Sequence, residues 1–171
     1  SIASFARSIE GPIDLLINNA GTSASNLGLS RDRAGVMDAP IDVTLDLIRI
    51  NGLSAASVTR NLVDCLEAGS QVANITSQIG SMVVGANFND LPYATSKAVM
   101  NMVTVQLASQ LKDAGISVVA FHPGWVRTDM GGSGADLSVE ESAQGILATM
   151  QTFEHADSGS FLRWDGSVHP W

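Results

Sequence analysis

The sequence predicts an α/β fold, a doubly wound, Rossmann-like parallel sheet with helices on both faces in three layers. Short apolar runs of strand length occur at residues 13–17, 72–76 and 116–121. Between them lie longer segments whose apolar residues recur at three- and four-residue steps, as in amphipathic helices. The short runs are almost continuously apolar, which is typical of strands buried on both faces. Strands that alternate with helices in this way favour a parallel sheet.

Four helices are expected, and most end where glycine or proline interrupts the apolar spacing. They cover residues 1–9, 43–67, 93–113 and 138–152, and a last short strand is expected at 161–163. Inside the second helix, Asn51 and Gly52 are poor helix formers. They indicate either a kink with a functional polar group or a tolerated irregularity of packing.

Composition restricts the kinds of partner. The 171 residues include 9 Lys and Arg against 17 Asp and Glu, a net charge of -8, which argues against nucleic acid and anionic membranes as partners. The only cysteine, Cys65, excludes an intrachain disulfide and suits a cytoplasmic, reducing setting. No apolar run has the length of a membrane span. The three histidines lack the spacing of metal ligands, so no metal is expected.

Polar residues follow each predicted strand, at the sheet edge where ligands bind in such folds. They are residues 18–21, Ser77 and residues 122–130. Tyr93 and Lys97 lie one helical turn apart, and a nearby ammonium favours the phenolate form of a tyrosine, so the pair could transfer protons. A solvated lysine beside a packed tyrosine is the ordinary alternative. Ser77 could bind a carbonyl oxygen or simply cap a turn.

Taken together, these motifs resemble the short-chain dehydrogenase/reductase family. The family pattern is an Asn-Asn-Ala-Gly turn, an Asn in the next helix, a Ser, a Tyr-x-x-x-Lys and a Pro-Gly turn ending in Thr, and it matches Asn18 to Gly21, Asn51, Ser77, Tyr93 with Lys97, and Pro123 to Thr128. The resemblance runs from about residue 14 to residue 130. Segments 123–132, 138–146 and 164–171 are most similar to the C-factor and sniffer-type carbonyl reductase group.

The resemblance implies an oxidoreductase that interconverts a carbonyl and an alcohol by hydride transfer. NAD(P)(H) would be the cofactor, with NADP(H) slightly favoured. Tyr93 would be the general acid and base, while Lys97 would hold the nicotinamide ribose and lower the pKa of Tyr93. Ser77 would polarise the substrate carbonyl, and Asn51 would support a water that relays protons to Lys97. Asp14 would stabilise the adenine pocket or its supporting turn. The remaining cofactor contacts would be Asn19, Ala20, Gly21, Pro123, Gly124, Val126 and Thr128.

The sequence departs from the family pattern in two places. Ser77 and Tyr93 are 16 residues apart, which is longer than usual and indicates an enlarged loop at residues 81–92. No Gly-x-Gly-x-x-Gly precedes the site, and the glycines of residues 131–134 fit a mobile lid better than a phosphate loop. Residues 1–171 are therefore expected to be one domain, the C-terminal two-thirds of a complete one. It would lack the first strands, leaving the strand at 13–17 as an exposed edge.

Two further expectations concern partners. The resemblance implies a small-molecule substrate and a homodimer or homotetramer formed through the helices at 43–67 and 93–113. An alternative function is also consistent with the sequence, because fold and function separate easily. The chain could be a non-catalytic signalling or interaction protein built on the same fold.

Overall fold

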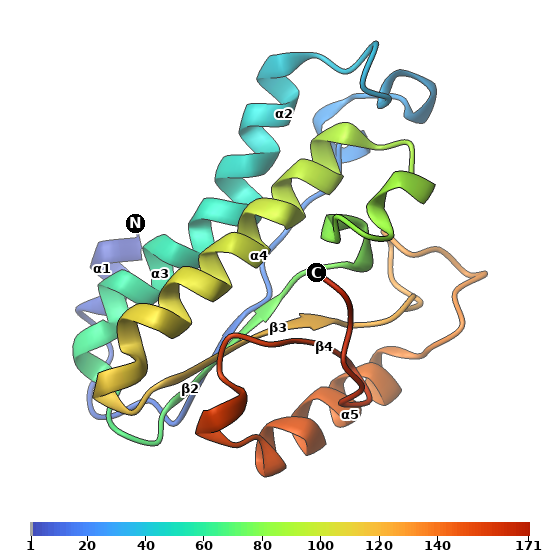
Figure 1. Cartoon of the computed structure of the whole chain (residues 1–171). Helices are drawn as coiled ribbons and strands as arrows, with labels where there is room; N and C mark the ends of the chain where they lie inside the picture. Colours follow the sequence, from blue (N-terminus) through green and yellow to red (C-terminus); the bar gives the residue numbers. More distant parts are fainter. Residues whose placement is uncertain (1) are drawn as a thin grey trace.

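The computed structural model describes residues 2–171, and its centre is a parallel sheet with the strand order β1-β2-β3-β4 (Figure 1). The strands are β1 (Leu15–Asn18), β2 (Gln71–Ile75), β3 (Ser117–His122) and β4 (Phe161–Arg163). All three neighbouring pairs are parallel. The predicted α/β fold and its four strands are confirmed, with boundaries that differ by one or two residues.

The helices are α1 (Ile2–Ala6), α2 (Ile41–Leu47), α3 (Ser54–Leu62), α4 (Leu91–Leu111) and α5 (Val139–Thr152). A π-helical segment, Ile48–Leu53, joins α2 to α3, so the irregularity predicted at Asn51 and Gly52 is confirmed. A Cβ atom on Gly52 would lie 2.9 Å from the carbonyl oxygen of Ser96 in α4. Glycine is needed there because α4 packs directly against this segment.

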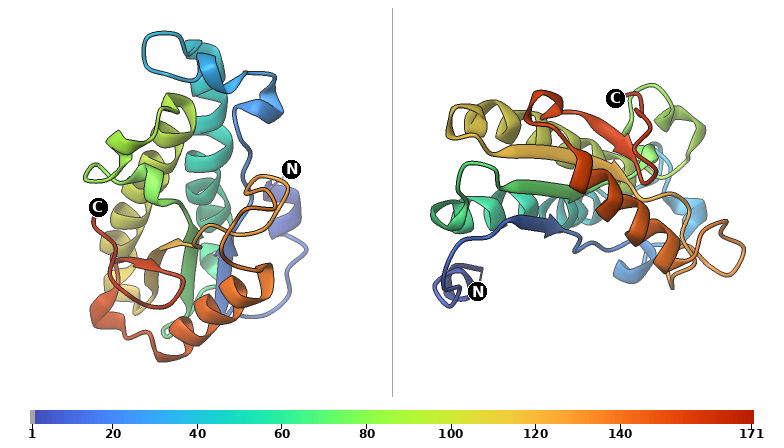
Figure 2. Two further views of the ribbon diagram at one scale, coloured as in Figure 1. Left: turned by 90° about the vertical axis from the view of Figure 1, so that its right-hand side faces the viewer. Right: turned by 90° about the horizontal axis from the view of Figure 1, so that it is seen from below.

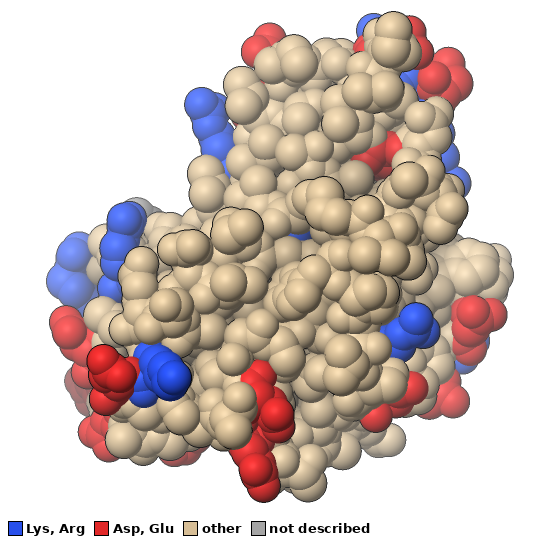
Figure 3. Space-filling model, in the orientation of Figure 1, with Lys and Arg blue, Asp and Glu red and all other residues tan. Residues whose placement is uncertain are grey.

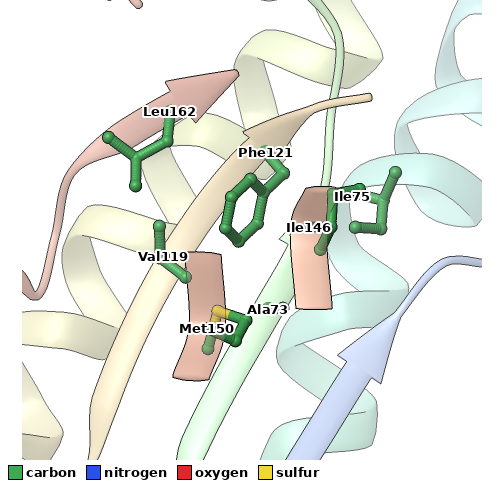
Figure 4. Packing of buried hydrophobic residues seen from close by; sticks show 7 residues of the cluster. All are labelled: Ala73, Ile75, Val119, Phe121, Ile146, Met150 and Leu162. Atoms are coloured by element: carbon green, nitrogen blue, oxygen red, sulfur yellow. The ribbon is translucent and has the colours of Figure 1, made fainter. Parts of the chain in front are cut away.

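Helices cover both faces of the sheet, which gives the three predicted layers (Figure 2). On one face, α4 packs against Val72 and Val118 through Ala108. On the other face, α5 packs against Phe121 through Ile146 (Figure 4). The strands advance across the sheet in one direction while α5 lies opposite α3 and α4. The connection through α5 therefore has the opposite hand from the first two, a departure from the usual uniformity of such crossovers.

The two edges of the sheet differ. β1 pairs only with β2 among residues 2–171, and Ile17 is 43% exposed, as expected for an edge strand. The β4 edge is covered by the C-terminal tail, where Val168 forms an antiparallel bridge with Leu162 and the His169 N–H donates to the Phe161 carbonyl. None of the helices described is long and apolar enough to cross a bilayer. The expectation that the chain is part of a larger domain stays a prediction.

Candidate active site

Tyr93 lies in the first turn of α4, beside the carboxyl ends of the strands. The start of α4 is fixed by Asp90, whose Oδ1 accepts a hydrogen bond from the Tyr93 backbone N–H at 3.1 Å, and by Pro92 in the first turn. This cap begins the helix two residues earlier than the apolar spacing predicts. The ring of Tyr93 packs against a cluster that includes Leu29 and Leu47, so the loop after β1 and helix α2 enclose it.

Lys97 is buried beneath Tyr93. Its Nζ donates to the Ile75 carbonyl at the end of β2 at 2.9 Å and lies 5.6 Å from the centroid of the Tyr93 ring. Burial lowers the pKa of Lys97 to about 8. An ammonium has three N–H donors, and the Ile75 carbonyl is the one acceptor that the described residues provide. Two N–H groups are thus available to another partner.

Asn51 fastens the turn after β1. Its Oδ1 accepts from the Thr22 backbone N–H at 2.7 Å, and its Nδ2 donates to the Thr22 carbonyl at 2.9 Å and to Ser96 Oγ at 3.0 Å. A Cβ atom on Gly21 would lie 3.3 Å from Asn51 Oδ1 and 3.7 Å from Lys97 Nζ. The turn predicted to hold the cofactor therefore lies against Lys97, and its remaining members, Asn19 and Ala20, are exposed.

Ser77 follows β2 at the same edge of the sheet. Its hydroxyl accepts from the Ile79 N–H at 3.3 Å, so the capping role weighed for this serine is present in the structure. The side chain remains half-buried at the edge of the site. A Cβ atom on Gly80 would lie 2.7 Å from the carbonyl carbon of Lys97, so only glycine lets this short turn press against α4. The contact holds the turn that follows Ser77 against the part of α4 that carries Lys97.

The segment after β3 is held by its own hydrogen bonds. Arg127 Nη1 donates to the carbonyls of Ala135 and Asp136, both at 3.0 Å, and the Gly131 N–H donates to Thr128 Oγ1 at 3.1 Å. A parallel bridge between Val126 and Leu137 closes the segment further.

The start of the same segment is anchored to α5. The Pro123 carbonyl accepts from Ser142 Oγ at 2.7 Å, and Gly124 has a φ of 84°, in the left-handed region. None of the described hydrogen bonds connects the predicted cofactor residues of this segment to Tyr93 or Lys97. The structure brings them to the same sheet edge without joining them to the pair.

A cavity of about 240 Å³ opens beside Tyr93. It lies between the loop after β1, the start of α4 and the segment after β3. It is lined by Ser23, Ala24, Ser25, Asn26, Leu29, Arg31, Ala34, Asp90, Tyr93, Asp129 and Met130. A larger cavity of about 540 Å³ lies between α5 and the residues around β4, and Tyr93 does not line it.

Sequence reasoning missed the charged residues of the smaller cavity, Arg31, Asp90 and Asp129. Asp90 alone carried a readable signal, since an aspartate just before Leu-Pro is a typical helix N-cap.

The electrostatics qualify one expectation about Tyr93. Burial, and to a smaller extent the negative charge of Asp90, raises the pKa of Tyr93 to about 12. In the free chain the net shift of the Tyr93 pKa is therefore upward, so any lowering by Lys97 is outweighed. The physical reason is that the loop after β1 and helix α2 desolvate the phenol. At neutral pH the Tyr93 hydroxyl is protonated.

A buried network of hydrogen bonds adjoins the site on the α4 face of the sheet. Asn18 Nδ2 donates to Asn74 Oδ1 at 2.8 Å and to Thr59 Oγ1 at 3.2 Å, and Asn74 Nδ2 donates to Thr104 Oγ1 at 2.9 Å. These contacts tie β1 and β2 to α3 and α4 immediately before the site residues. The structure contains no group of three or more His, Cys, Asp or Glu within residues 2–171 that could hold a metal ion.

Comparison with known proteins identifies the family. A family model described as short chain dehydrogenase matches residues 1–136. C-signal of Myxococcus xanthus is 35% identical over 167 residues, which cover 94% of each chain. The 1-hydroxy-2-glutathionyl-2-methyl-3-butene dehydrogenase of Rhodococcus sp. (strain AD45) is 31% identical over 148 residues, 81% of this chain and 66% of that one. The chain belongs to the short-chain dehydrogenase/reductase family, a family of oxidoreductases.

Solved structures narrow the resemblance to carbonyl reductases. The NADPH-bound carbonyl reductase from chicken fatty liver superposes with a TM-score of 0.87 at 30% identity, covering 100% of this chain and 73% of that one. The carbonyl reductase Sniffer of D. melanogaster gives a TM-score of 0.89 at 26% identity, covering 99% and 73%. The predicted likeness to the C-factor and sniffer-type group is confirmed. The chain spans nearly all of C-signal but only part of the dehydrogenase and the reductases.

Proposed function

We propose that the chain is an NAD(P)-dependent oxidoreductase that interconverts a carbonyl and an alcohol, with Tyr93 as general acid and base. One observation carries the proposal: a protonated phenol lies above a buried ammonium that has two N–H groups to spare, next to a cavity. A phenol in this state is suited to giving its proton to a carbonyl oxygen as that oxygen gains negative charge.

The residues present fit the nicotinamide and ribose end of the cofactor. The spare N–H groups of Lys97 would donate to ribose hydroxyls, and Gly21 leaves the space beside Lys97 Nζ free of a side chain. The turns at the same sheet edge, with Asn19, Ala20, Pro123, Gly124, Val126 and Thr128, would line the rest of this end. The cofactor supplies or accepts the hydride when it is bound. The likeness to an NADPH-bound carbonyl reductase slightly favours NADP(H).

The other site residues orient the reacting groups. Ser77 would donate its hydroxyl proton to the substrate carbonyl oxygen, because its present contact with Ile79 uses only an acceptor position. Asn51 acts mainly by position, since its amide fixes Thr22 and Ser96. Both N–H groups of Asn51 are engaged, so a water that relays protons to Lys97 would have to donate a hydrogen bond to an oxygen of this residue.

We propose a small carbonyl or alcohol as the substrate and association through α2, α3 and α4. Figure 3 shows a face with few charged side chains over α4, where Met102 is 59% and Val105 38% exposed. Leu45 and Leu53, 44% and 47% exposed, add apolar surface on α2 and the π-helical segment. Such surface supports a homodimer or homotetramer.

The unpaired Cys65 supports a cytoplasmic setting.

Cofactor titration and a single variant test the proposed reaction. NADPH and NADH are titrated into the protein and followed by nicotinamide fluorescence, and reduction of an aromatic aldehyde is then measured at saturating cofactor. Tyr93→Phe is expected to lower kcat by at least about 100-fold, because it removes the proton donor. It should leave the Kd of the cofactor nearly unchanged. Turnover retained in Tyr93→Phe would refute the assigned proton donor.

A signalling or interaction protein is the second candidate, favoured by the match to C-signal along 94% of both chains. The titration with NADPH and NADH distinguishes this candidate from the oxidoreductase. Binding of neither NADPH nor NADH by the folded protein would favour this candidate over the oxidoreductase. Binding together with loss of turnover in Tyr93→Phe would favour the oxidoreductase.

A further inference from the structure

Asp90 contacts the same helical turn as Tyr93 and lines the same cavity. Its Oδ1 accepts the Tyr93 backbone N–H at 3.1 Å, which makes it the N-cap of the 21-residue helix α4. Asp90 and Tyr93 both line the cavity of about 240 Å³. The hydrogen bond to the helix backbone prevents the carboxylate from turning away, so a negative charge is held at the start of the helical turn that carries Tyr93, in the lining of the same cavity.

Four charged groups surround Tyr93. Lys97 lies on α4, Asp90 caps its start, Arg31 belongs to the loop after β1, and Asp129 belongs to the segment after β3. Arg31 and Asp129 have opposite signs and line the same cavity, but Asp90 is the charge that contributes to the raised pKa of Tyr93. The positive end of the α4 dipole and Lys97 both favour a phenolate at Tyr93. Asp90 is the charge at the start of α4 that opposes them.

We propose that Asp90 is a positioning residue whose negative charge disfavours ionisation of the Tyr93 hydroxyl in the free chain and so limits proton abstraction by Tyr93 to more alkaline conditions. The consequence for proton abstraction from an alcohol rests on the proposed function, whereas the ionisation of Tyr93 does not. Burial is the larger cause and the Asp90 charge the second cause that raise the pKa of Tyr93 to about 12. At the alkaline pH where Tyr93 titrates, the Asp90 carboxyl is ionised.

Tyr93 reports its own ionisation, because it is the only tyrosine in the sequence. Ultraviolet absorbance of tyrosinate therefore follows this single hydroxyl, without cofactor or substrate. The absorbance is read in a stopped-flow pH jump before unfolding begins, and circular dichroism follows the slower loss of structure. The test variant is Asp90→Asn, which keeps an oxygen to cap α4 and removes the charge. The matched control is Asp129→Asn, which removes a carboxylate from another part of the cavity lining.

The midpoint of Tyr93 ionisation is expected to fall by roughly one pH unit in Asp90→Asn. In Asp129→Asn it should stay close to that of the unchanged protein. Added salt should narrow the difference between Asp90→Asn and the unchanged protein, because the cavity is open to solvent. Equal midpoints in the folded Asp90→Asn variant and the unchanged protein would overturn the proposal, and so would an equal fall in Asp129→Asn.

A second variant covers the case in which Asp90→Asn does not fold. Asp90→Ser is uncharged, retains a capping oxygen and should give the same downward shift. The titration also separates this proposal from the proposed function. A protein that binds no cofactor can still show the shift, and an active enzyme without the shift retains its activity while the role of Asp90 is lost. In an active preparation, the pH profile of alcohol oxidation should move downward with the midpoint.

Discussion

The two faces of the same four strands are held by different kinds of interaction. The centre of the α5 face is packed with apolar side chains, namely Ala73, Ile75, Val119, Phe121, Ile146, Met150 and Leu162. The α4 face becomes polar toward the site, where Asn18 and Asn74 bind each other and the helices. Apolar burial stabilises without fixing direction, whereas hydrogen bonds orient their partners. Hydrogen bonds on the face that carries Tyr93 and Lys97 therefore serve mainly to orient the site residues, whereas apolar packing on the opposite face serves mainly to stabilise the fold.

The largest effect is expected on the apolar face. Phe121→Ala removes a side chain with 0% exposure and should lower the free energy of unfolding by about 3 to 5 kcal/mol, since it leaves a cavity between the sheet and α5. Urea unfolding followed by circular dichroism measures it. Leu147→Ala, at a 45% exposed position of α5, is the control and should cost far less. A loss below about 1 kcal/mol for Phe121→Ala would contradict the stabilising role of this face.

The next largest effect is expected from variants that disrupt the hydrogen-bond network of Asn18 and Asn74. Asn74→Ala removes one hydrogen-bond partner each from the Asn18 amide and the Thr104 hydroxyl and should cost about 2 to 3 kcal/mol. The same urea experiment on the Asn18→Ala and Asn74→Ala variants and their combination forms a double-mutant cycle. The double variant should lose less unfolding free energy than the sum of the two single losses, because both single variants break the same hydrogen bond between Asn18 and Asn74. Strict additivity would show that the two amides do not interact.

The third prediction concerns the stability that is lost because the Lys97 ammonium is buried in the site. This ammonium has a pKa of about 8 in the fold, against 10.5 for a lysine exposed to water, so between these values the unfolded chain binds more protons. Stability should therefore rise as pH increases from 8 to 10.5. Lys97→Met should stabilise the protein at pH 7 by about 2 kcal/mol and remove this rise. A variant less stable than the unchanged protein at pH 7 would contradict the inference.

The smallest effect is expected from a change at the start of α5, which is compared with the start of α4. Ser138 and Glu141 form a capping box at the start of α5, with bonds of 3.1 Å and 2.8 Å. Ser138→Ala should cost about 1 kcal/mol in urea unfolding and leave the Tyr93 titration unchanged, because α5 lies on the other face. A shifted tyrosine midpoint in Ser138→Ala would show that the two faces are coupled.

Much of the fold follows from local patterns, whereas the chemistry of the site depends on distant contacts. Apolar spacing located the strands and helices, and the pair Asn51-Gly52 located the π-helical segment. The family motif located Tyr93 and Lys97. The raised pKa of Tyr93 was not predictable, because it depends on how the loop after β1 folds over the ring. The reversed hand of the α5 connection was equally hidden, since the sequence pattern of a crossover helix is the same on either face.

That reversed connection has a consequence for how the molecule opens. α5 is the only α-helix packed into the apolar cluster on its face of the sheet among the residues described, and β3 is the only one of the other three strands that pairs with β4. Residues 139–163 can therefore separate as one cooperative unit while β1, β2, β3, α3 and α4 keep their mutual contacts. In native-state hydrogen exchange, the amides of α5 and β4 should exchange together through one opening, and those of α4 through a rarer one. The buried pair of Tyr93 and Lys97 would then keep its structure when α5 and β4 have opened.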